Sequence, residues 1–348
     1  MKVIESHLDI RFIGFGTARP KGPGFSNADL LKRNPATKDW GETKIGLMAK
    51  RIEDELGFKH RYFSHFPGDA FAHETEESTE SLALEATKAA VGARVTEIEA
   101  FVHGTTTSRR FAGSQAASIM GSFGHVCPAY ETKAGCSTSL AALHMGQALL
   151  KFGYKNVLVS GAETLSKVID PARRDDWFGL ADGAASIWME NSSPADAHVR
   201  VLKSFFSTRG EHVDLYTTSG ILPPRREDVD AGGFSLRGDG LALGALSKKH
   251  YVDMLKTLLP TEEERRSIRW IVPHQVSRRL IDDVVGELKI GGEILWSADR
   301  IGNIGGSSIL YTLSEALEKN TFKKGDRILL ASVGGGLSFA GQVWEARS

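Results

Sequence analysis

A weak internal repeat, with a period close to half the chain length, constrains the fold more than any other sequence feature. The segment EIEAFVHGTTTSRR resembles SIRWIVPHQVSRR, with Ile98 matching Ile268 at an offset of 170 residues. The segment ETKAGCSTSLAALHMGQALLKFGYKNVLVSGAE resembles GNIGGSSILYTLSEALEKNTFKKGDRILLASVGGG, with Ser139 matching Ser308 at an offset of 169. An offset near half of 348 residues predicts two similarly folded halves rather than a short-period solenoid.

Strand and helix patterns alternate along both halves. Apolar runs such as EAFVHG, NVLVSGAE, RWIVPHQ and RILLASVGGG predict buried strands, and STESLALEATKAAVGA has a polar cap before an apolar stripe. Alternation of this kind indicates an α/β fold. No linker rich in proline or serine divides the chain, and we place the two halves at residues 1–195 and 196–348.

Composition excludes several classes of protein. Lys plus Arg equals Asp plus Glu at 43 each, so no global charge predicts binding to nucleic acid or to a membrane. No run reaches the ~18 apolar residues of a membrane span, and the N-terminus lacks the apolar core of a signal peptide. Two cysteines, Cys127 and Cys136, cannot form a disulfide framework or a CxxC metal site, so we expect a cytoplasmic protein.

Cys136 has two possible interpretations, a buried core thiol or a nucleophile. Gly135 before it permits a sharp bend, and the run Ser137-Thr138-Ser139 after it can cap the free amides of a following apolar helix. The positive end of a helix favours a thiolate. Cys127 has no such setting and is interpreted as a core residue.

Two residues could assist a thiol nucleophile at this position. His274 follows a predicted strand in IVPHQ, and Asn303 lies in the glycine-rich turn GNIGGSS before the matching helix of the second half. In the proposed repeat, Cys136, His274 and Asn303 all lie at corresponding strand ends, where open α/β sheets bind ligands.

The chain resembles 3-oxoacyl-(acyl-carrier-protein) synthase III, a family of initiating condensing enzymes. The resemblance rests on AGCSTSLAALHMG, WIVPHQ, GNIGGSSI and GGGLSFAG in this order, and it covers nearly the whole chain. It implies a thiolase-like, five-layered αβαβα fold made of two similar halves, usually assembled as a homodimer.

The resemblance also implies a two-step reaction. Cys136 would accept an acyl group from a coenzyme A or carrier-protein thioester, and His274 and Asn303 would bind the carbonyl of a malonyl-type thioester during decarboxylative condensation. The backbone amides of Cys136 and Gly335 would form the oxyanion hole. Acyl carrier protein and acyl-coenzyme A are therefore the expected partners, and we expect no metal and no resident cofactor.

The sequence departs from the family pattern around the expected substrate pocket. Arg51 and Glu55 stand where coenzyme A-dependent members often have Trp and Arg, and a carboxylate near nucleotide phosphates is unfavourable. Val333 stands where Phe is common, and with Leu337 it flanks the glycine triplet. Phe111 stands where the family extends a residue across the dimer into the partner's pocket.

These departures favour a specialised pathway, such as polyketide biosynthesis, over housekeeping fatty acid initiation. Arg278 and Arg279 follow PHQ, where the family binds acidic carrier proteins. Three alternatives remain at this point. One is an acyltransferase of the same family that acts on an alcohol or amine, and another is a catalytically weak subunit of a heterodimer. The third is a papain-like peptidase, whose CGSCW-type flank is missing.

Overall fold

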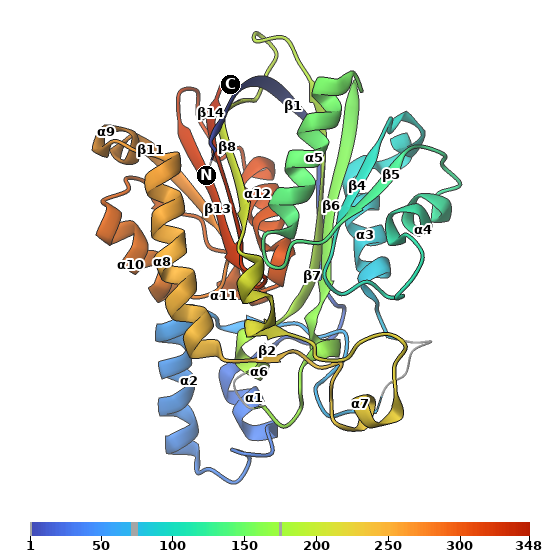
Figure 1. Cartoon of the computed structure of the whole chain (residues 1–348), viewed down its shortest axis with the longest axis vertical. Helices are drawn as coiled ribbons and strands as arrows, with labels where there is room; N and C mark the ends of the chain where they lie inside the picture. The colour runs from blue at the N-terminus through green and yellow to red at the C-terminus, as the bar shows by residue number, and fades with distance from the viewer. Residues whose placement is uncertain (1, 71–75, 174–175) are drawn as a thin grey trace.

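A computed structural model describes residues 2–70, 76–173 and 176–348, and Figure 1 shows their arrangement. Ten strands form one mixed sheet in the order β12-β11-β13-β14-β8-β1-β7-β6-β4-β5. In chain order these strands are β1 (Ile4–Ala18), β4 (Phe101–Gly104), β5 (Ala129–Thr132), β6 (Asn156–Thr164), β7 (Asp182–Asn191), β8 (Val199–Thr208), β11 (Ile268–Pro273), β12 (Glu293–Ile294), β13 (Arg327–Gly334) and β14 (Ser338–Ala346). Two small sheets pair β2 (Phe25–Ser26) with β3 (His60–Arg61), and β9 (Tyr216–Thr217) with β10 (Arg237–Gly238).

Helices connect these strands. The α-helices are α1 (Asn27–Arg33), α2 (Glu42–Leu56), α3 (Thr79–Val91), α4 (Gln115–Ser122), α5 (Thr138–Phe152), α6 (Asp176–Gly179), α7 (Arg226–Asp230), α8 (Gly240–Leu258), α9 (Glu262–Arg266), α10 (Arg278–Leu288), α11 (Ala298–Ile301) and α12 (Ser308–Glu318). Short 3-10 helices are η1 (Gly92–Glu97), η2 (Leu165–Val168), η3 (Gly210–Leu215) and η4 (Gly305–Ser307).

The large sheet repeats one strand arrangement twice. Its first five strands in chain order run β5-β4-β6-β7-β1 across the sheet, and its last five run β12-β11-β13-β14-β8 in the corresponding order. The directions also correspond, because β4 is parallel to β5 and β6, as β11 is to β12 and β13, whereas β7 and β14 are antiparallel to their neighbours. Antiparallel pairing of β1 with β8 joins the two sets. The predicted duplication is confirmed.

The boundary between the halves lies in a short connection. β7 ends at Asn191 and β8 begins at Val199. The division that we placed between residues 195 and 196 falls between these strands and stays a prediction.

The five predicted layers are also present. Helix α3 packs on β1, β6 and β7, while α5 and α12 contact each other and strands from both halves of the sheet. On the far side α8 packs on β13 and β14, and α10 packs on α8. Figure 1 shows α5 and α12 between α8 and α10 on one side and α3 and α4 on the other. The fold is therefore the αβαβα arrangement that the resemblance implied.

The central elements are apolar because protein covers both of their sides. All residues of β13 except Arg327 are buried, and so are all of β6 except Asn156. Parallel strands that are covered on both faces have such continuous apolar runs, as the sequence predicted. Within the described part of the chain, no helix has both the length and the apolar character needed to cross a membrane.

Candidate active site

Cys136 lies in a bend between β5 and α5. β5 ends at Thr132, α5 begins at Thr138, and Gly135 between them has a φ of +53°. A Cβ atom at Gly135 would lie 2.2 Å from the carbonyl oxygen of Gly335, so a larger residue would displace backbone. The predicted strand, bend and helix around Cys136 are confirmed.

The hydroxyl groups after Cys136 do not cap α5, and this part of the prediction is wrong. Ser137 begins the helix without a side-chain cap bond, and its hydroxyl donates instead to the carbonyl of Ser338 at 3.2 Å. The hydroxyl of Ser139 donates to the carbonyl of Gly306. The start of α5 is buried against the second half of the chain, so these hydroxyls satisfy carbonyl groups there.

The glycine triplet at the end of β13 closes around Cys136. A Cβ atom at Gly334 would lie 2.3 Å from the Cβ atom of Cys136, so only glycine allows this approach. The backbone groups of Gly335 and of Cys136 itself lower the pKa of the thiol. The two amides predicted to form an oxyanion hole therefore lie beside the sulfur, and their role stays a prediction.

The surroundings of Cys136, a partly buried residue, raise the pKa of its thiol to about 11. Desolvation is the main cause and the negative charge of Glu163 acts in the same direction, while the backbone groups of Gly335 and Cys136 oppose them. The helix start therefore does not produce the resting thiolate that the sequence favoured.

Asn303 shares a cavity with Cys136. Its side chain is 5 % exposed and lines the cavity. The Oδ1 atom accepts hydrogen bonds from the Gly305 N–H at 2.9 Å and the Ser308 hydroxyl at 3.4 Å. Within the described residues its amide nitrogen makes no hydrogen bond, so this donor is available to a substrate carbonyl.

His274 lies one strand away from the glycine triplet. It follows β11, and its backbone N–H donates to the carbonyl of Ala331 on β13 at 2.8 Å. The ring is 2 % exposed, its Nδ1 atom has no hydrogen-bond partner among the described residues, and burial lowers its pKa to about 4. His274 is therefore a neutral imidazole at neutral pH. It does not line the cavity that Cys136 and Asn303 share.

The cavity beside Cys136 has a volume of about 270 Å³. Small and apolar side chains form most of its wall, and Lys133 is the one charged residue among its described lining residues. The lining residues are Thr106, Thr107, Lys133, Gly135, Cys136, Leu165, Val168, Leu180, Val213, Tyr216, Thr217, Thr218, Leu236, Asn303, Gly305, Gly306, Gly335 and Gly336.

The five residues predicted to bind substrate or carrier lie outside this lining. Val333 and Leu337 are buried in the apolar core that α8 and β14 share. Phe111 is 74 % exposed, with its ring 6.0 Å from that of Phe234.

The two arginines of this set begin α10, on the surface. Arg278 forms an ion pair with Asp282 at 3.0 Å, whereas Arg279 is exposed. The roles of all five residues stay predictions.

Sequence reasoning missed a buried carboxyl group beside the site. Glu163 is fully buried near the end of β6, and the loop Thr105-Thr106-Thr107 donates hydrogen bonds to it. Burial raises its pKa to about 7. The run of three threonines after one predicted strand and the acidic residue at the end of another were the signals in the sequence.

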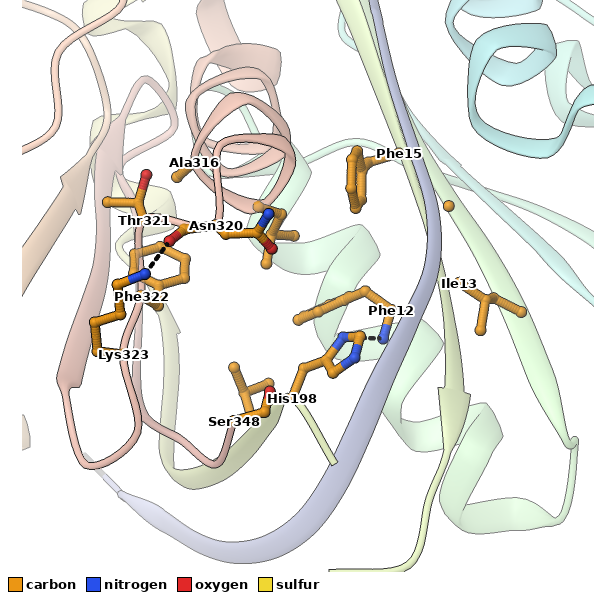
Figure 2. Close-up of a pocket in the computed structure, with 13 residues that line it drawn as sticks. Phe12, Ile13, Phe15, His198, Ala316, Asn320, Thr321, Phe322, Lys323 and Ser348 are labelled. Carbon is orange, nitrogen blue, oxygen red and sulfur yellow. Dashed lines mark hydrogen bonds between the residues drawn. The ribbon is translucent and has the colours of Figure 1, made fainter. Parts of the chain in front are cut away.

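A larger cavity of about 580 Å³ lies away from Cys136, between β1, the end of α12 and the C-terminal residue (Figure 2). Figure 2 shows Phe12, Phe15 and Phe322 around it. Two of its polar groups are satisfied locally, because the Phe12 N–H donates to Nδ1 of His198 and Nζ of Lys323 donates to the carbonyl of Asn320. None of the predicted site residues lines this cavity, so the smaller one is the candidate active site.

Two family models match the parts of the chain that carry the site. The model for 3-oxoacyl-(acyl-carrier-protein) synthase III matches residues 130–210, which include Cys136. The model for the C-terminal part of the same family matches residues 261–346, which include His274, Asn303 and Gly335.

Comparison with individual proteins gives a similar result over the whole chain. Beta-ketoacyl-(acyl-carrier-protein) synthase III of Clostridium perfringens (strain SM101 / Type A) is 28% identical over 339 residues, which cover 94% of this chain and 97% of the relative. The fold also matches the crystal structure of 3-oxoacyl-(acyl-carrier-protein) synthase III from Aquifex aeolicus VF5, with a TM-score of 0.79, 23% identity, and coverage of 97% of this chain and 99% of the other. A priming β-ketosynthase from the R1128 polyketide biosynthetic pathway matches with a TM-score of 0.79 at 22% identity, covering 99% of this chain and 98% of the other.

Proposed function

The chain is a 3-oxoacyl-(acyl-carrier-protein) synthase III-like protein, and on that premise we propose that it joins an acyl group to a malonyl-type thioester through Cys136. As a condensing enzyme of this kind it is an acyltransferase of fatty acid or polyketide biosynthesis. The observation that carries the proposal is the close approach of the glycine triplet to Cys136, beside a cavity that Asn303 also lines.

The first step is acyl transfer to sulfur. The thiol of Cys136 loses its proton as the sulfur attacks the carbonyl carbon of an acyl thioester, and the carbonyl oxygen becomes negatively charged. The amides of Cys136 and Gly335 stabilise that oxygen, and removal of one such donor costs about 3 kcal/mol of transition-state stabilisation. The carbon–sulfur bond of the donor breaks, the released thiol takes up a proton, and the acyl group stays on Cys136.

The second step is decarboxylative condensation. The free amide nitrogen of Asn303 and a neutral imidazole at His274 would donate hydrogen bonds to the carbonyl of a malonyl-type thioester. Loss of carbon dioxide leaves an enolate, which these donors stabilise. The enolate carbon attacks the acyl carbonyl, the bond to Cys136 breaks, and the sulfur regains its proton as the β-ketoacyl thioester leaves.

Acyl carrier protein or coenzyme A would deliver both substrates, and we propose no metal or resident cofactor. The exposed Arg279 at the start of α10 suits an acidic carrier better than Arg278 does, because Asp282 already pairs with Arg278. A cytoplasmic location, where both carriers are available, stays a prediction.

We propose that the chain forms a homodimer through the edge of its sheet. β5 is the last strand at one edge of the sheet, so one side of it offers unpaired backbone groups. Tyr130 on β5 is 41 % exposed, Val126 before it is 95 % exposed, and Phe111 is 74 % exposed. We propose that β5 of two copies pair and that Phe111 reaches the partner's pocket.

The test separates condensation from simple acyl transfer. The protein, pre-acylated on Cys136, is incubated with malonyl-carrier protein, and the products are identified by mass spectrometry. We expect a β-ketoacyl thioester, with carbon dioxide released in equal amount. Asn303→Ala should abolish the product while leaving the acyl-enzyme intact. Transfer of the acyl group to an added alcohol or amine, without loss of carbon dioxide, would instead support the acyltransferase alternative.

A further inference from the structure

Glu163 accepts hydrogen bonds from three consecutive threonines while lying fully buried. The Thr106 N–H lies 2.9 Å from Oε1 and 3.1 Å from Oε2. The hydroxyls of Thr107, Thr106 and Thr105 lie 2.7, 2.9 and 3.4 Å from Oε2. A single carboxyl group therefore fixes the whole loop that follows β4.

The same carboxyl group touches both sides of the Cys136 cavity. Thr106 and Thr107 form one part of its wall, and Gly305 and Gly306 form another. A Cβ atom at Gly306 would lie 3.3 Å from Oε1 of Glu163, and one at Gly305 would lie 3.5 Å from its Cγ. Because the Gly305 N–H also holds Asn303, the position of Glu163 bears on that residue as well.

The charge of Glu163 has no counterion among the described residues, since all of the donors that it contacts there are neutral. When it is ionised, its negative charge opposes ionisation of Cys136. Two other titratable groups bear on that thiol within the same part of the chain. Tyr216 on β9 interacts with it and donates a hydrogen bond to Asp176 at 3.3 Å, and Lys133 lines the cavity.

We propose that Glu163 is a positioning residue of the Cys136 site. Its carboxyl group holds the loop Thr105-Thr106-Thr107 in place against the turn Gly305-Gly306, and so fixes two parts of the wall of the Cys136 cavity. This inference rests on the proposed function, in which Cys136 is the nucleophile. A wall held in this way keeps the space beside Cys136 in one shape for an entering thioester.

The test compares two substitutions that separate charge from reach, both in a Cys127→Ser background. Glu163→Gln keeps the length of the side chain and removes the charge, whereas Glu163→Asp keeps the charge and is too short to hold the threonines. Alkylation of Cys136 by iodoacetamide is followed by intact-protein mass spectrometry between pH 6.5 and 9. Transfer of an acyl group from acyl-coenzyme A to Cys136 is timed on the same proteins.

Glu163→Gln should accept acyl groups at close to the parent rate, because its amide oxygen reaches as far as the carboxylate and still accepts hydrogen bonds from the threonines. Glu163→Asp should be alkylated at the parent rate but should accept acyl groups at least about tenfold more slowly. Alkylation reports whether the thiol of Cys136 stays equally accessible, so faster alkylation of Glu163→Asp would show a loosened site and overturn the proposal. Equal acylation rates for Glu163→Gln and Glu163→Asp would also overturn it.

Thr107→Val keeps the inference falsifiable if the substitutions of Glu163 prevent folding. This variant removes the 2.7 Å hydrogen bond and leaves the carboxyl group in place. It should accept acyl groups more slowly without faster alkylation, and an unchanged acylation rate would overturn the positioning role. Failure of the proposed function and failure of the inference about Glu163 would look different. If the proposed function is wrong, the parent protein itself will not be acylated, although its thiol can still be alkylated because alkylation needs no thioester.

Discussion

At the scale of single residues, the candidate site depends on how closely the backbone of β13 approaches the bend that contains Cys136. Glycine at positions 135 and 334 lets β13 and the bend before α5 meet at Cys136, and this brings backbone amides close to the sulfur. The bend and the close approach of the glycines could be predicted from the sequence, because short motifs specify them, whereas the role of Cys136 as nucleophile stays a prediction. The hydrogen bonds of Ser137 and Ser139 could not be predicted from the sequence, because their acceptors lie more than 150 residues away in the chain.

Gly334→Ala should remove most acylation of Cys136. The new methyl group would lie 2.3 Å from the Cβ atom of Cys136, so the bend or the end of β13 must move. A displacement of about 1 Å at a reactive centre can cost about a hundredfold in rate. The rate of acyl-enzyme formation checks this expectation. Gly46→Ala on α2, where a Cβ atom meets nothing within 4 Å, is the control, and equal rates for the two variants would contradict it.

Buried titratable groups should affect the pH dependence of stability in opposite directions: Glu163 favours the folded state at low pH, and two histidines favour it at high pH. Burial raises the pKa of Glu163 from 4.5 to about 7, so its contribution to stability is present below pH 4.5 and is lost as the pH rises through 7. Burial lowers the pKa of His103 and His274 from 6.5 to about 4, so their contributions are present above pH 6.5 and are lost as the pH falls through 4. The two histidines outweigh the one carboxyl group on acidification.

The wild-type protein should therefore lose stability between pH 7 and pH 5, and Glu163→Gln should lose roughly twice as much. His274→Gln should lose less than the wild type does. Free energies of unfolding from urea titrations at the two pH values check this order. A Glu163→Gln protein that parallels the wild type would show that this carboxyl group is ionised throughout the range.

At the scale of elements, α2 carries two of the residues at which the sequence departs from the family pattern. Arg51 and Glu55 on this helix form an ion pair at 3.0 Å and line a surface groove of about 420 Å³ with Leu31, Met48 and Phe178 among its other residues. The sequence predicted that these two side chains replace a nucleotide-binding pair. Their mutual pairing could not be predicted without the helix register, which places them four residues apart on one face.

Glu55→Ala should improve the use of acyl-coenzyme A if its nucleotide enters through this groove. Removing the carboxylate frees Arg51 for a phosphate, and exposed pairs of this kind are worth about 0.2 to 1 kcal/mol, so KM should fall by about 1.4- to fivefold. The KM for a carrier-protein donor should not change. Glu53→Ala, on the same helix but outside the groove lining, is the matched control. Equal KM values in all three proteins would exclude the groove as a nucleotide site.

At the scale of the whole molecule, the duplication was the most predictable feature and the junction between the halves the least. Offsets of about 170 residues indicated two halves, and the strand order repeats as expected. The pairing of β1 with β8, which makes one continuous sheet, has no signal in local periodicity because β1 is a long strand that pairs on both of its edges. The position of Glu163 beside the Gly305 turn is likewise a consequence of the tertiary fold.

Tyr130→Lys should weaken self-association if β5 is the interface. The substitution places a charge on an exposed edge strand, which opposes pairing of two such edges. We expect the apparent mass in light scattering to shift from two copies towards one, with the melting temperature of the separated chain retained. Leu47→Lys on α2, which also replaces an exposed apolar side chain, should leave the mass unchanged. A dimer that persists in Tyr130→Lys would place the interface elsewhere.

The most direct test of the central claim is intact-protein mass spectrometry after incubation with a panel of acyl-coenzyme A and acyl-carrier-protein thioesters. The account predicts a mass increase of one acyl group, located by peptide mapping at Cys136 and absent from Cys136→Ala, with Cys127→Ser labelled as fully as the wild type. Labelling that persists in Cys136→Ala, or no labelling by any thioester of a broad panel, would contradict it.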